Sequence, residues 1–249
     1  MRTLCVFYHR KKAIKHRAQK LIQRLRAAGY RLRINKSAAR ADLALALGGD
    51  GTVLKTIHRT LQHRLPVLPV ALGRLSFLAE IKAEKLLVAL EKFFRGQHCK
   101  ETRAMLNVTV IRSQRRRSVF VINEAALTRN GYPRLFDIVV RYGARTAAYR
   151  ADGLIIATPT GSTAYNLAAG GPALKPLAPQ YLLTPVCPFP RPEKSRVISL
   201  KQKTIIQAGG KKPNFVVICD GYRMLKFRPQ DTLEISRGER TFTLVRFAR

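Results

Sequence analysis

The sequence of 249 residues has little of three things: acidic side chains, closely spaced cysteines and long apolar runs. No apolar run approaches the roughly 18 residues that a membrane-spanning helix needs, so we expect no such segment. The apolar stretch near the start, 4–8, is followed by no small-residue cleavage site and predicts no signal peptide. The four cysteines lie far apart, with no zinc-binding spacing, as is typical of free thiols in a reducing compartment. We therefore expect a cytoplasmic protein.

The scarcity of acids leaves a formal charge of +33, from 47 Lys and Arg against 14 Asp and Glu. A basic surface attracts polyanions such as nucleic acid or phosphorylated small molecules. The basic residues are nevertheless spread along the whole chain. The one tight cluster, Arg115–Arg117, lies between two strand-like runs and predicts a solvated hairpin tip. We therefore interpret the charge as a property of the solvated surface and expect no nucleic-acid partner.

The first hundred residues alternate between two patterns. Apolar runs typical of buried strands are followed by stretches in which apolar residues recur at helical spacing. We expect strands at 4–8, 30–34, 43–47 and 66–72, and helices at 14–28, 53–61 and 84–94. Strands that alternate with helices in this way predict βαβ units and a parallel sheet.

After about residue 97 the pattern changes to short strands separated by glycine turns, which predicts a β-rich half. We expect strands at 107–111, 119–122, 136–140, 204–207, 216–219, 232–235 and 241–245, and turns at Gly131, Gly209-Gly210, Gly221 and Gly238. The proline-rich stretch 176–192 is predicted to be an ordered loop. The chain is therefore divided into an α/β domain over 1–100 and a β-rich domain over 101–249.

A glycine loop, Gly48-Gly49-Asp50-Gly51-Thr52, lies between the strand expected at 43–47 and the next helix. Glycines let the backbone approach an anion, and a helix start supplies free N–H groups, so the loop suits phosphates. A carboxylate there makes sense if it accepts a proton from an attacking hydroxyl or holds Mg²⁺. The alternative is a tight turn in which Asp50 is a helix cap. By itself the motif indicates phosphoryl transfer, since lipid kinases and, in variant form, phosphofructokinases also carry it.

A second motif, Thr-Pro-Thr-Gly-Ser-Thr-Ala-Tyr-Asn-Leu-Ala-Ala-Gly-Gly-Pro, occupies 158–172. Pro159 and Gly161 predict a turn, and Ser162 or Thr163 a cap for a short helix. Hydroxyls and amides at a helix start suit an anion or a ribose, and Tyr165 adds a ring face and a hydroxyl. Physics alone leaves a purely structural loop–helix turn open.

This run, preceded by Ala151-Asp152-Gly153 and combined with Asn123-Glu124 and the glycine loop, resembles the signature of the NAD kinases over nearly the whole chain. Lipid kinases and phosphofructokinases do not carry it. The resemblance implies a Rossmann-like or phosphofructokinase-like α/β domain followed by a β-rich sandwich domain. It also implies a homo-oligomeric enzyme, a dimer or tetramer. That enzyme phosphorylates the 2′-hydroxyl of the adenosine ribose of NAD with ATP and Mg²⁺, giving NADP.

The resemblance also implies the site residues. Asp50 is expected to be the proton acceptor. The residues expected to face the ATP phosphates are Gly48, Gly49, Gly51 and Thr52. The residues expected to bind NAD are Asp50, Gly51, Asn123, Glu124, Arg134, Arg150, Asp152, Thr163, Ala164, Tyr165, Asn166, Leu167, Ala168 and Tyr222. The metal ligands are not identified.

The chain departs from the family pattern at 69–78, where Ala71 replaces an Asn and Ser76 replaces the second Gly of a Gly-X-Leu-Gly-Phe-Leu element. The charge of +33 is not a family trait either. It leads to the hypothesis that inorganic polyphosphate, which some NAD kinases use, serves as a donor. Two alternatives stay open: a lipid kinase with the same glycine loop, and a basic, inactive relative that binds nucleotides or other polyanions.

Overall fold

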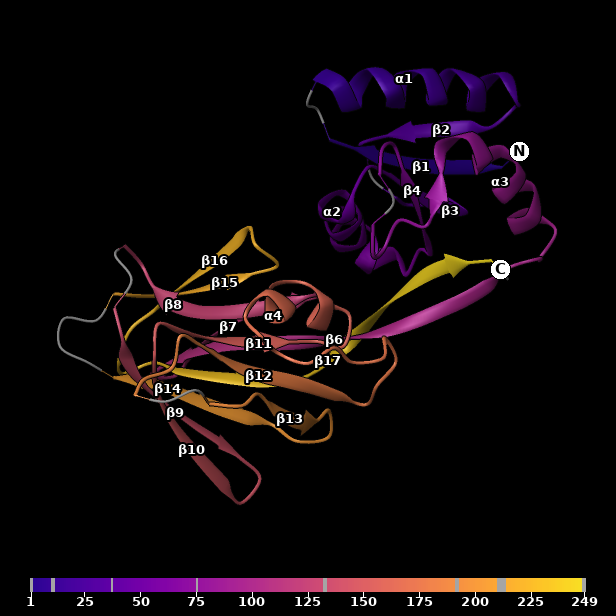
Figure 1. The fold of residues 1–249 in the computed structure, drawn as a ribbon. Helices are drawn as coiled ribbons and strands as arrows, with labels where there is room; N and C mark the ends of the chain where they lie inside the picture. Colours follow the sequence, from indigo (N-terminus) through magenta and orange to yellow (C-terminus); the bar gives the residue numbers. More distant parts are fainter. Residues whose placement is uncertain are drawn as a thin grey trace. The chain divides into compact units, whose positions relative to one another are not determined.

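The structure, a computed structural model, describes residues 2–9, 12–36, 38–74, 76–131, 134–190, 193–209 and 214–247. The chain divides into two compact units: unit 1 holds residues 1–103 and 241–249, and unit 2 holds residues 104–240. Figure 1 shows helices α1, α2 and α3 beside the strands of unit 1, whereas unit 2 is built mostly of strands. Among the helices so described, none is long and apolar enough to cross a membrane.

Unit 1 has alternating strands and helices, as the sequence predicts. Its elements are β1 (Thr3–Tyr8), α1 (Lys12–Ala27), β2 (Arg31–Ile34), β3 (Leu43–Leu47), α2 (Asp50–Thr60), β4 (Val67–Ala71), β5 (Ile81–Lys82) and α3 (Leu86–Phe94), with short 3-10 helices at Leu61–His63 and Ala83–Lys85. The strands β6 (Cys99–Arg112) and β17 (Thr232–Arg246) each have residues in both units.

The sheet of unit 1 is parallel, in the order β17-β4-β3-β1-β2, with β5 also beside β4. β1 and β3 are neighbours, yet β1 leads through α1 to β2 on one side, and β3 leads through α2 to β4 on the other. In sheets of this kind ligands bind outside the carboxyl ends of the strands, at the point where the winding reverses. The glycine loop follows β3 and therefore lies at that point.

Periodic apolar residues hold this layer together. Leu21, Ile22 and Leu25 of α1 are buried in one cluster with leucines of β1 and β3, such as Leu4 and Leu45. The opposite face of α1 is basic, and Arg24 and Arg26 lie in its last turn, where the helix dipole favours cations. The helix predicted at 14–28 is thus a basic amphipathic cover for the sheet.

Unit 2 is a sandwich of two antiparallel layers. Its elements, besides parts of β6 and β17, are β7 (Arg115–Val121), β8 (Glu124–Arg129), β9 (Phe136–Tyr142), β10 (Arg145–Ala151), β11 (Gly153–Ala157), α4 (Tyr165–Ala168), β12 (Gln180–Val186), β13 (Arg196–Ser199), β14 (Thr204–Gly209), β15 (Phe215–Cys219) and β16 (Arg223–Phe227), with a 3-10 helix at Gly161–Thr163. One layer is β13-β12-β11-β8-β15-β16, and the other contains β10-β9-β14-β17 with β6 and β7. Side chains of both layers, such as Leu127 and Ile138, share one buried core.

Three sequence expectations for unit 2 were wrong in detail. The proline-rich stretch contains β12, and its Pro185 lies beyond the part that pairs with β13, so the missing N–H removes no bond from that ladder. The strands expected at 232–235 and 241–245 form one strand, β17, and Gly238 lies inside it. A Cβ on Gly238 would lie 3.1 Å from the Met105 carbonyl oxygen, so glycine here allows close packing rather than a turn. Of the turn expected at Gly209-Gly210, residue 210 lies outside the described residues.

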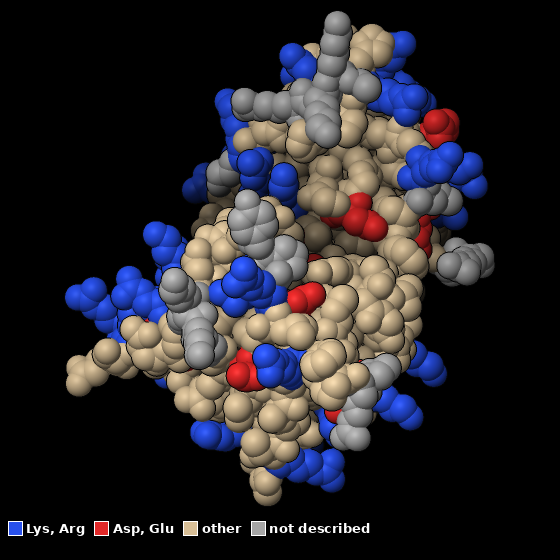
Figure 2. Space-filling model, turned by 60° about the vertical axis from the view of Figure 1, so that its left-hand side comes forward, with Lys and Arg blue, Asp and Glu red and all other residues tan. Residues whose placement is uncertain are grey.

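The basic residues are spread over the surface. Figure 2 shows Lys and Arg side chains scattered over the face that it draws, with few acids among them. The cluster Arg115–Arg117 is exposed as predicted, but it forms the start of β7 and pairs with the end of β6. The hairpin turn itself is at Ser113, whose φ of 52° is left-handed.

One ion pair of unit 2 is deeply buried on its acidic side. The side chain of Asp231 is 0% exposed and receives Nε and Nη2 of Arg112 at 2.8 and 2.6 Å, and the Arg228 backbone N–H at 2.8 Å. Burial opposes ionisation of Asp231, but the hydrogen bonds from Arg112 and Arg228 outweigh it and lower the pKa of the carboxyl. The pair joins β6 to the turn before β17.

We predict that Asp231→Ala lowers the free energy of unfolding by about 3 kcal/mol, because it leaves the guanidinium and the Arg228 amide without their acceptor. Urea denaturation would measure the loss. The matched control is Glu234→Ala, which removes a similar pair at 2.6 Å whose Arg116 is 54% exposed. That variant is expected to lose less than about 1 kcal/mol. Equal losses in the two variants would contradict the prediction.

Candidate active site

The glycine loop forms the start of α2. β3 ends at Leu47, and α2 begins at Asp50 with Gly49 as an extended cap residue. Gly48 has a φ of 152°, and a Cβ on it would lie 2.6 Å from Oγ1 of Thr52, so the position requires glycine. The amides of Thr52 and Val53 bond to the Gly49 carbonyl at 2.9 and 3.2 Å. The earlier amides of the first turn have no partner within the helix, as an anion-binding helix start requires.

Asp50 is half-buried, and one of its carboxylate oxygens is already occupied. Ser76 Oγ donates to Oδ1 at 2.7 Å, and the Leu78 backbone N–H donates to the same oxygen at 3.0 Å. Among the described residues no group donates to Oδ2. The carboxyl is thus fixed by the turn at 76–79 and keeps one oxygen able to accept a proton.

A basic cavity of about 300 Å³ lies beside the loop. Lys55 and Arg59 are one turn apart on α2, so both side chains point to the same face of the helix. The cavity is lined by Phe7, Tyr8, His9, Asn35, Thr52, Lys55, Thr56 and Arg59. Since β1 ends at Tyr8 and His9 follows it, this is the reversal point of the sheet. The cavity has the charge and place of a phosphate site.

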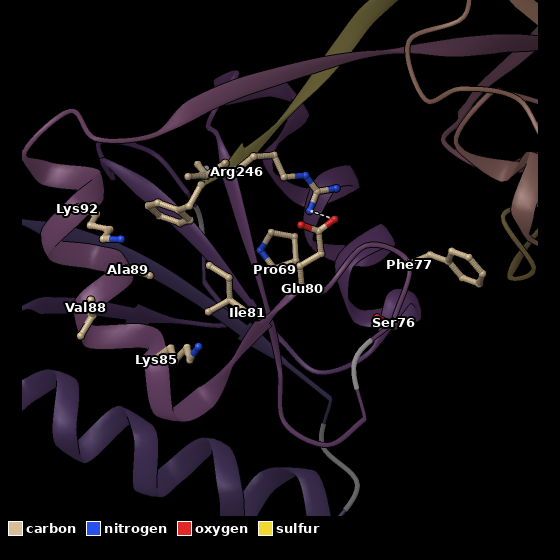
Figure 3. A pocket seen from close by; sticks show the side chains of 12 residues that line it. Pro69, Ser76, Phe77, Glu80, Ile81, Lys85, Val88, Ala89, Lys92 and Arg246 are labelled. Atoms are coloured by element: carbon tan, nitrogen blue, oxygen red, sulfur yellow. Dashed lines mark ion pairs between the residues drawn. The ribbon is translucent and has the colours of Figure 1, made fainter. Parts of the chain in front are cut away.

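A larger cavity of about 650 Å³ in unit 1 is mostly apolar and is lined by none of the loop residues 48–52. Figure 3 shows Lys85, which precedes α3, and Val88, Ala89 and Lys92 of α3 on one of its sides, and Glu80 paired with Arg246 on another. The two groups of this pair are 3.5 Å apart. The smaller cavity is lined by Thr52 of the glycine loop, and the larger one by Ser76, which bonds to Asp50.

In unit 2 the strand ends bring a second group together. β8 lies between β11 and β15 and is antiparallel to both, so the start of β8 meets the ends of its two neighbours at one edge. There the carboxylate of Asp220 receives the backbone N–H groups of Ile122, Asn123 and Glu124 at 2.7 to 3.3 Å. The Asn123-Glu124 pair is therefore held by its backbone, which leaves both side chains available for a ligand.

Glu124 is an unusual carboxyl. It is only 8% exposed, and its Oε2 has no hydrogen-bond partner among the described residues. Burial raises the pKa of Glu124 to about 7, and the nearby Asp220 carboxylate adds to the rise. A buried acceptor of this kind is suited to the hydroxyl groups of a ligand, which would supply the missing hydrogen bond.

The loop 158–168 packs against this edge. Thr158 donates from its N–H to the Asn123 carbonyl at 2.8 Å and from Oγ1 to the Ile122 carbonyl at 2.5 Å. A Cβ on Gly161 would lie 2.1 Å from the Asn123 carbonyl oxygen, so glycine is required there. Thr163 and Ala164 are half-buried, Ala168 is exposed, and Tyr165 and Leu167 are 48% and 47% exposed.

Asn166 lies inside this loop. It is 0% exposed, and its amide donates to the carbonyls of Ser162 and Pro172 at 2.9 and 3.0 Å. Its Oδ1 accepts from Thr184 Oγ1 at 2.6 Å. Its side chain therefore fixes the shape of the loop.

The other expected NAD residues fall at two places. Tyr222, 40% exposed, follows Asp220 at the Glu124 edge. Arg150, in β10, and Asp152 both come shortly before Gly153, the first residue of β11, about 13 Å along the strand from Ala157. Arg134, which is exposed, precedes β9, whose first residues pair with the last residues of β10, so it lies near Arg150. Unit 2 thus gathers two groups, one at each end of β11.

Sequence reasoning missed Asp220, Lys55 and Arg59. A signal for Asp220 existed, because Asp-Gly directly follows the apolar run of β15, and its φ of 49° is one that Asp tolerates. The i, i+4 spacing of Lys55 and Arg59 after the glycine loop was a further signal. In the described part of the chain, no three His, Cys, Asp or Glu side chains gather to hold a metal ion.

Comparison with known proteins gives one consistent result. Residues 6–98 match a family model described as the ATP-NAD kinase N-terminal domain, and residues 122–247 match the ATP-NAD kinase C-terminal domain. An NAD kinase of Lachnoclostridium phytofermentans is 36% identical over 213 residues, covering 82% of this chain and 75% of that protein. An NAD kinase of Symbiobacterium thermophilum is 32% identical over 247 residues, covering 92% and 87%.

Two solved structures share the fold. Yeast NADH kinase complexed with NADH superposes with a TM-score of 0.87 at 20% identity, covering 100% of this chain and 84% of that one. An NAD kinase from Archaeoglobus fulgidus in complex with ATP gives 0.76 at 25% identity, covering 100% and 94%. These likenesses confirm the expected fold, an α/β part followed by a β-rich part.

We predict that Glu124→Gln makes unit 2 more stable at pH 8 and changes little near pH 4.5. Between the ordinary pKa of a glutamate and about 7, the folded chain keeps a proton that the unfolded chain releases, so stability falls as pH rises through this window. The amide cannot ionise and removes the penalty, up to about 3 kcal/mol at pH 8.

Urea denaturation at the two pH values measures the effect. Glu239→Gln, on the exposed part of β17, is the matched control and should give the same small difference at both. If the difference in unfolding free energy between wild type and Glu124→Gln is the same at both pH values, burial does not raise the pKa of Glu124.

Proposed function

The chain belongs to the NAD kinase family, and from that membership we propose how it works as a phosphotransferase. It transfers the γ-phosphoryl group of ATP to the 2′-hydroxyl of the adenosine ribose of NAD, giving NADP. Matches to both family domains and 36% identity to an NAD kinase support the activity. The observation that carries the mechanism is Asp50, a carboxylate at the start of a phosphate-type helix with one oxygen fixed and the other open.

Asp50 acts as the proton acceptor. The 2′-oxygen of the ribose forms a bond to the γ-phosphorus, and the bond from that phosphorus to the β–γ bridging oxygen breaks, so ADP leaves. The hydroxyl proton passes to the open oxygen of Asp50. A carboxylate beside phosphates would otherwise weaken their binding, so a role in proton transfer explains its presence.

The donor phosphates bind at the start of α2. Gly48, Gly49, Gly51 and Thr52 supply a backbone that can approach them closely, and the helix start supplies partial positive charge. Lys55 and Arg59 in the adjoining cavity add the cations that a polyphosphate chain needs.

NAD is held by unit 2. Asn123 can donate and accept hydrogen bonds, and the buried Glu124 accepts from ribose hydroxyls. Beside them lies a partly exposed loop, whose shape Asn166 holds and whose further contacts are Thr163, Ala164, Tyr165, Leu167 and Ala168. Tyr222 lies at the same edge, and Arg134, Arg150 and Asp152 form a further group of contacts at the other end of β11. Asp50 and Gly51 meet the acceptor ribose.

Mg²⁺ accompanies ATP in this proposal. Mg²⁺ keeps several waters and is commonly held by one or two carboxylates together with the phosphates of a substrate. In this proposal the ATP phosphates and water would hold the ion, because the one open oxygen of Asp50 takes the proton. When bound, the metal neutralises charge that develops on the phosphates.

Neither alternative is favoured. A lipid kinase with the same glycine loop does not explain the match of residues 122–247 to an NAD kinase domain. A binding protein without catalysis does not explain a fixed carboxylate with an open oxygen at a phosphate-type helix start. Both alternatives predict no NADP from NAD and ATP, so one assay tests them together.

We place the enzyme in the cytoplasm as a homo-oligomer. In the described residues, Cys5, Cys99, Cys187 and Cys219 form no disulfide, which suits a reducing compartment. The oligomer rests on what is usual in the family. Light scattering after size exclusion, and cell fractionation, would test the two assignments, and a monomer or an exported protein would contradict them.

We predict that purified protein with NAD and MgATP forms NADP, and that Asp50→Asn lowers kcat by about 10²- to 10⁴-fold, the usual contribution of a general base. An NADP-specific dehydrogenase would report the product. Asp42→Asn, an exposed carboxylate of unit 1 that accepts the Thr3 N–H, serves as the control and should keep full activity. Wild-type turnover in Asp50→Asn would refute the role given to Asp50.

We also predict that inorganic polyphosphate with Mg²⁺ replaces ATP as donor, and that Lys55→Met raises the KM for either donor about tenfold without raising the KM for NAD. The reason is the loss of one phosphate contact, worth about 1.5–3 kcal/mol when charge-assisted. Lys100→Met, exposed on β6 and outside the cavity, is the matched control. The polyphosphate hypothesis fails if no NADP forms from that donor.

A further inference from the structure

We propose that the hydroxyl of Ser76 is a positioning group for Asp50, built into this chain where the family pattern has a glycine. This inference rests on the proposed function, because it concerns the proton acceptor of that reaction. The contact is direct: Ser76 Oγ lies 2.7 Å from Oδ1 of Asp50, a distance typical of a hydroxyl donating to a carboxylate. The two residues are 26 positions apart in the sequence, so only the fold joins them.

The direction of this hydrogen bond follows from the other partner of the hydroxyl. The Ala79 backbone N–H donates to Ser76 Oγ at 3.3 Å. A carboxylate can only accept, and a hydroxyl has a single proton, so that proton points to Asp50. Ser76 also donates from its own N–H to the Ala79 carbonyl at 3.2 Å, which closes the turn on itself. The hydroxyl therefore cannot rotate away without losing both partners.

The turn is anchored from its other side. Its Leu78 donates to the same Oδ1 at 3.0 Å through the N–H, and its carbonyl accepts from Nη1 of Arg246 at 3.0 Å. Figure 3 shows Arg246 reaching the Glu80 carboxylate, with which it forms an ion pair. The same guanidinium donates from Nε to Glu101 at 3.2 Å. Arg246, the last residue of β17, thus links the turn at 76–79 to Glu80 and Glu101, all within unit 1.

This arrangement decides which oxygen of Asp50 takes part in the reaction. Two donors converge on Oδ1, so the carboxyl cannot rotate freely and Oδ2 keeps a constant direction. A proton acceptor works only when it is within hydrogen-bond reach of the proton that it takes, so constraining its rotation raises the fraction of productive encounters. Glycine at position 76 would leave the Leu78 amide as the one remaining donor of the pair.

The test is a comparison of hydroxyl-bearing and hydroxyl-free variants. Ser76→Ala and Ser76→Gly are expected to lower kcat about tenfold, the effect of one charge-assisted hydrogen bond, with the KM values for NAD and ATP unchanged. Ser76→Thr keeps the hydroxyl and is expected to remain close to wild type. The matched control is Thr60→Val, which removes a buried hydroxyl of α2 whose partners among the described residues are the carbonyls of Thr56 and Ile57 in the same helix. It should keep full kcat.

A double-mutant cycle separates positioning from a general structural role. In the Asp50→Asn background, Ser76→Ala is expected to cause less than about a twofold further loss, because its effect passes through the carboxylate. A full additional tenfold loss there, or equal losses in Ser76→Ala and Ser76→Thr, would overturn the inference. If Ser76→Ala keeps wild-type kcat while Asp50→Asn is impaired, the inference about Ser76 fails and the proposed role of Asp50 stands. Wild-type kcat in Asp50→Asn would instead overturn the proposed role of Asp50.

Discussion

The carboxylate of Asp220 accepts the backbone N–H groups of three consecutive residues, Ile122 to Glu124, and the rest of the unit 2 site depends on this interaction. Buried amides at a strand start have no ladder partner, and leaving one unpaired costs about 1–3 kcal/mol. One side chain from the end of β15 satisfies all three. It thereby fixes the edge against which the loop 158–168 packs, with Gly161 in direct contact with Asn123.

That solution has an electrostatic consequence. A carboxylate placed under the backbone of Glu124 makes ionisation of the buried Glu124 less favourable. At an exposed position the repulsion between two carboxylates would be small, because water screens it. Here Glu124 is 8% exposed, so the cost is not screened and the pKa of this carboxyl is raised to about 7. At a ligand site this cost can be offset, because a hydroxyl of the ligand can donate a hydrogen bond to the carboxylate. Carboxyl groups with shifted pKa values are common at functional sites.

In unit 1 hydrogen-bond donors also fix a carboxylate, that of Asp50. The start of α2 favours anions, and so it favours both the phosphates and the carboxylate of Asp50. The turn at 76–79, held by Arg246, occupies one oxygen of that carboxylate and leaves the other open. Although basic residues outnumber acidic ones by 47 to 14, several of the few acids are placed at sites where the backbone or an arginine fixes them. The basic excess is spread over the surface, whereas three of the acids, Asp50, Glu124 and Asp220, lie at the candidate site.

The sequence by itself determined the two-part character of the fold, the glycine loop at a helix start, and the family, because these depend on local periodicity and on contiguous motifs. It predicted most elements of the first hundred residues. It missed β12 in the proline-rich stretch and the continuity of β17 through Gly238, since whether Pro185 or Gly238 is tolerated depends on the strand or side chain beside it. Only the tertiary structure brought Asp220 to Asn123 and Ser76 to Asp50, pairs 97 and 26 residues apart. Contacts of that separation leave no periodic trace in a sequence, because they are set by which strand ends meet at one edge of a sheet.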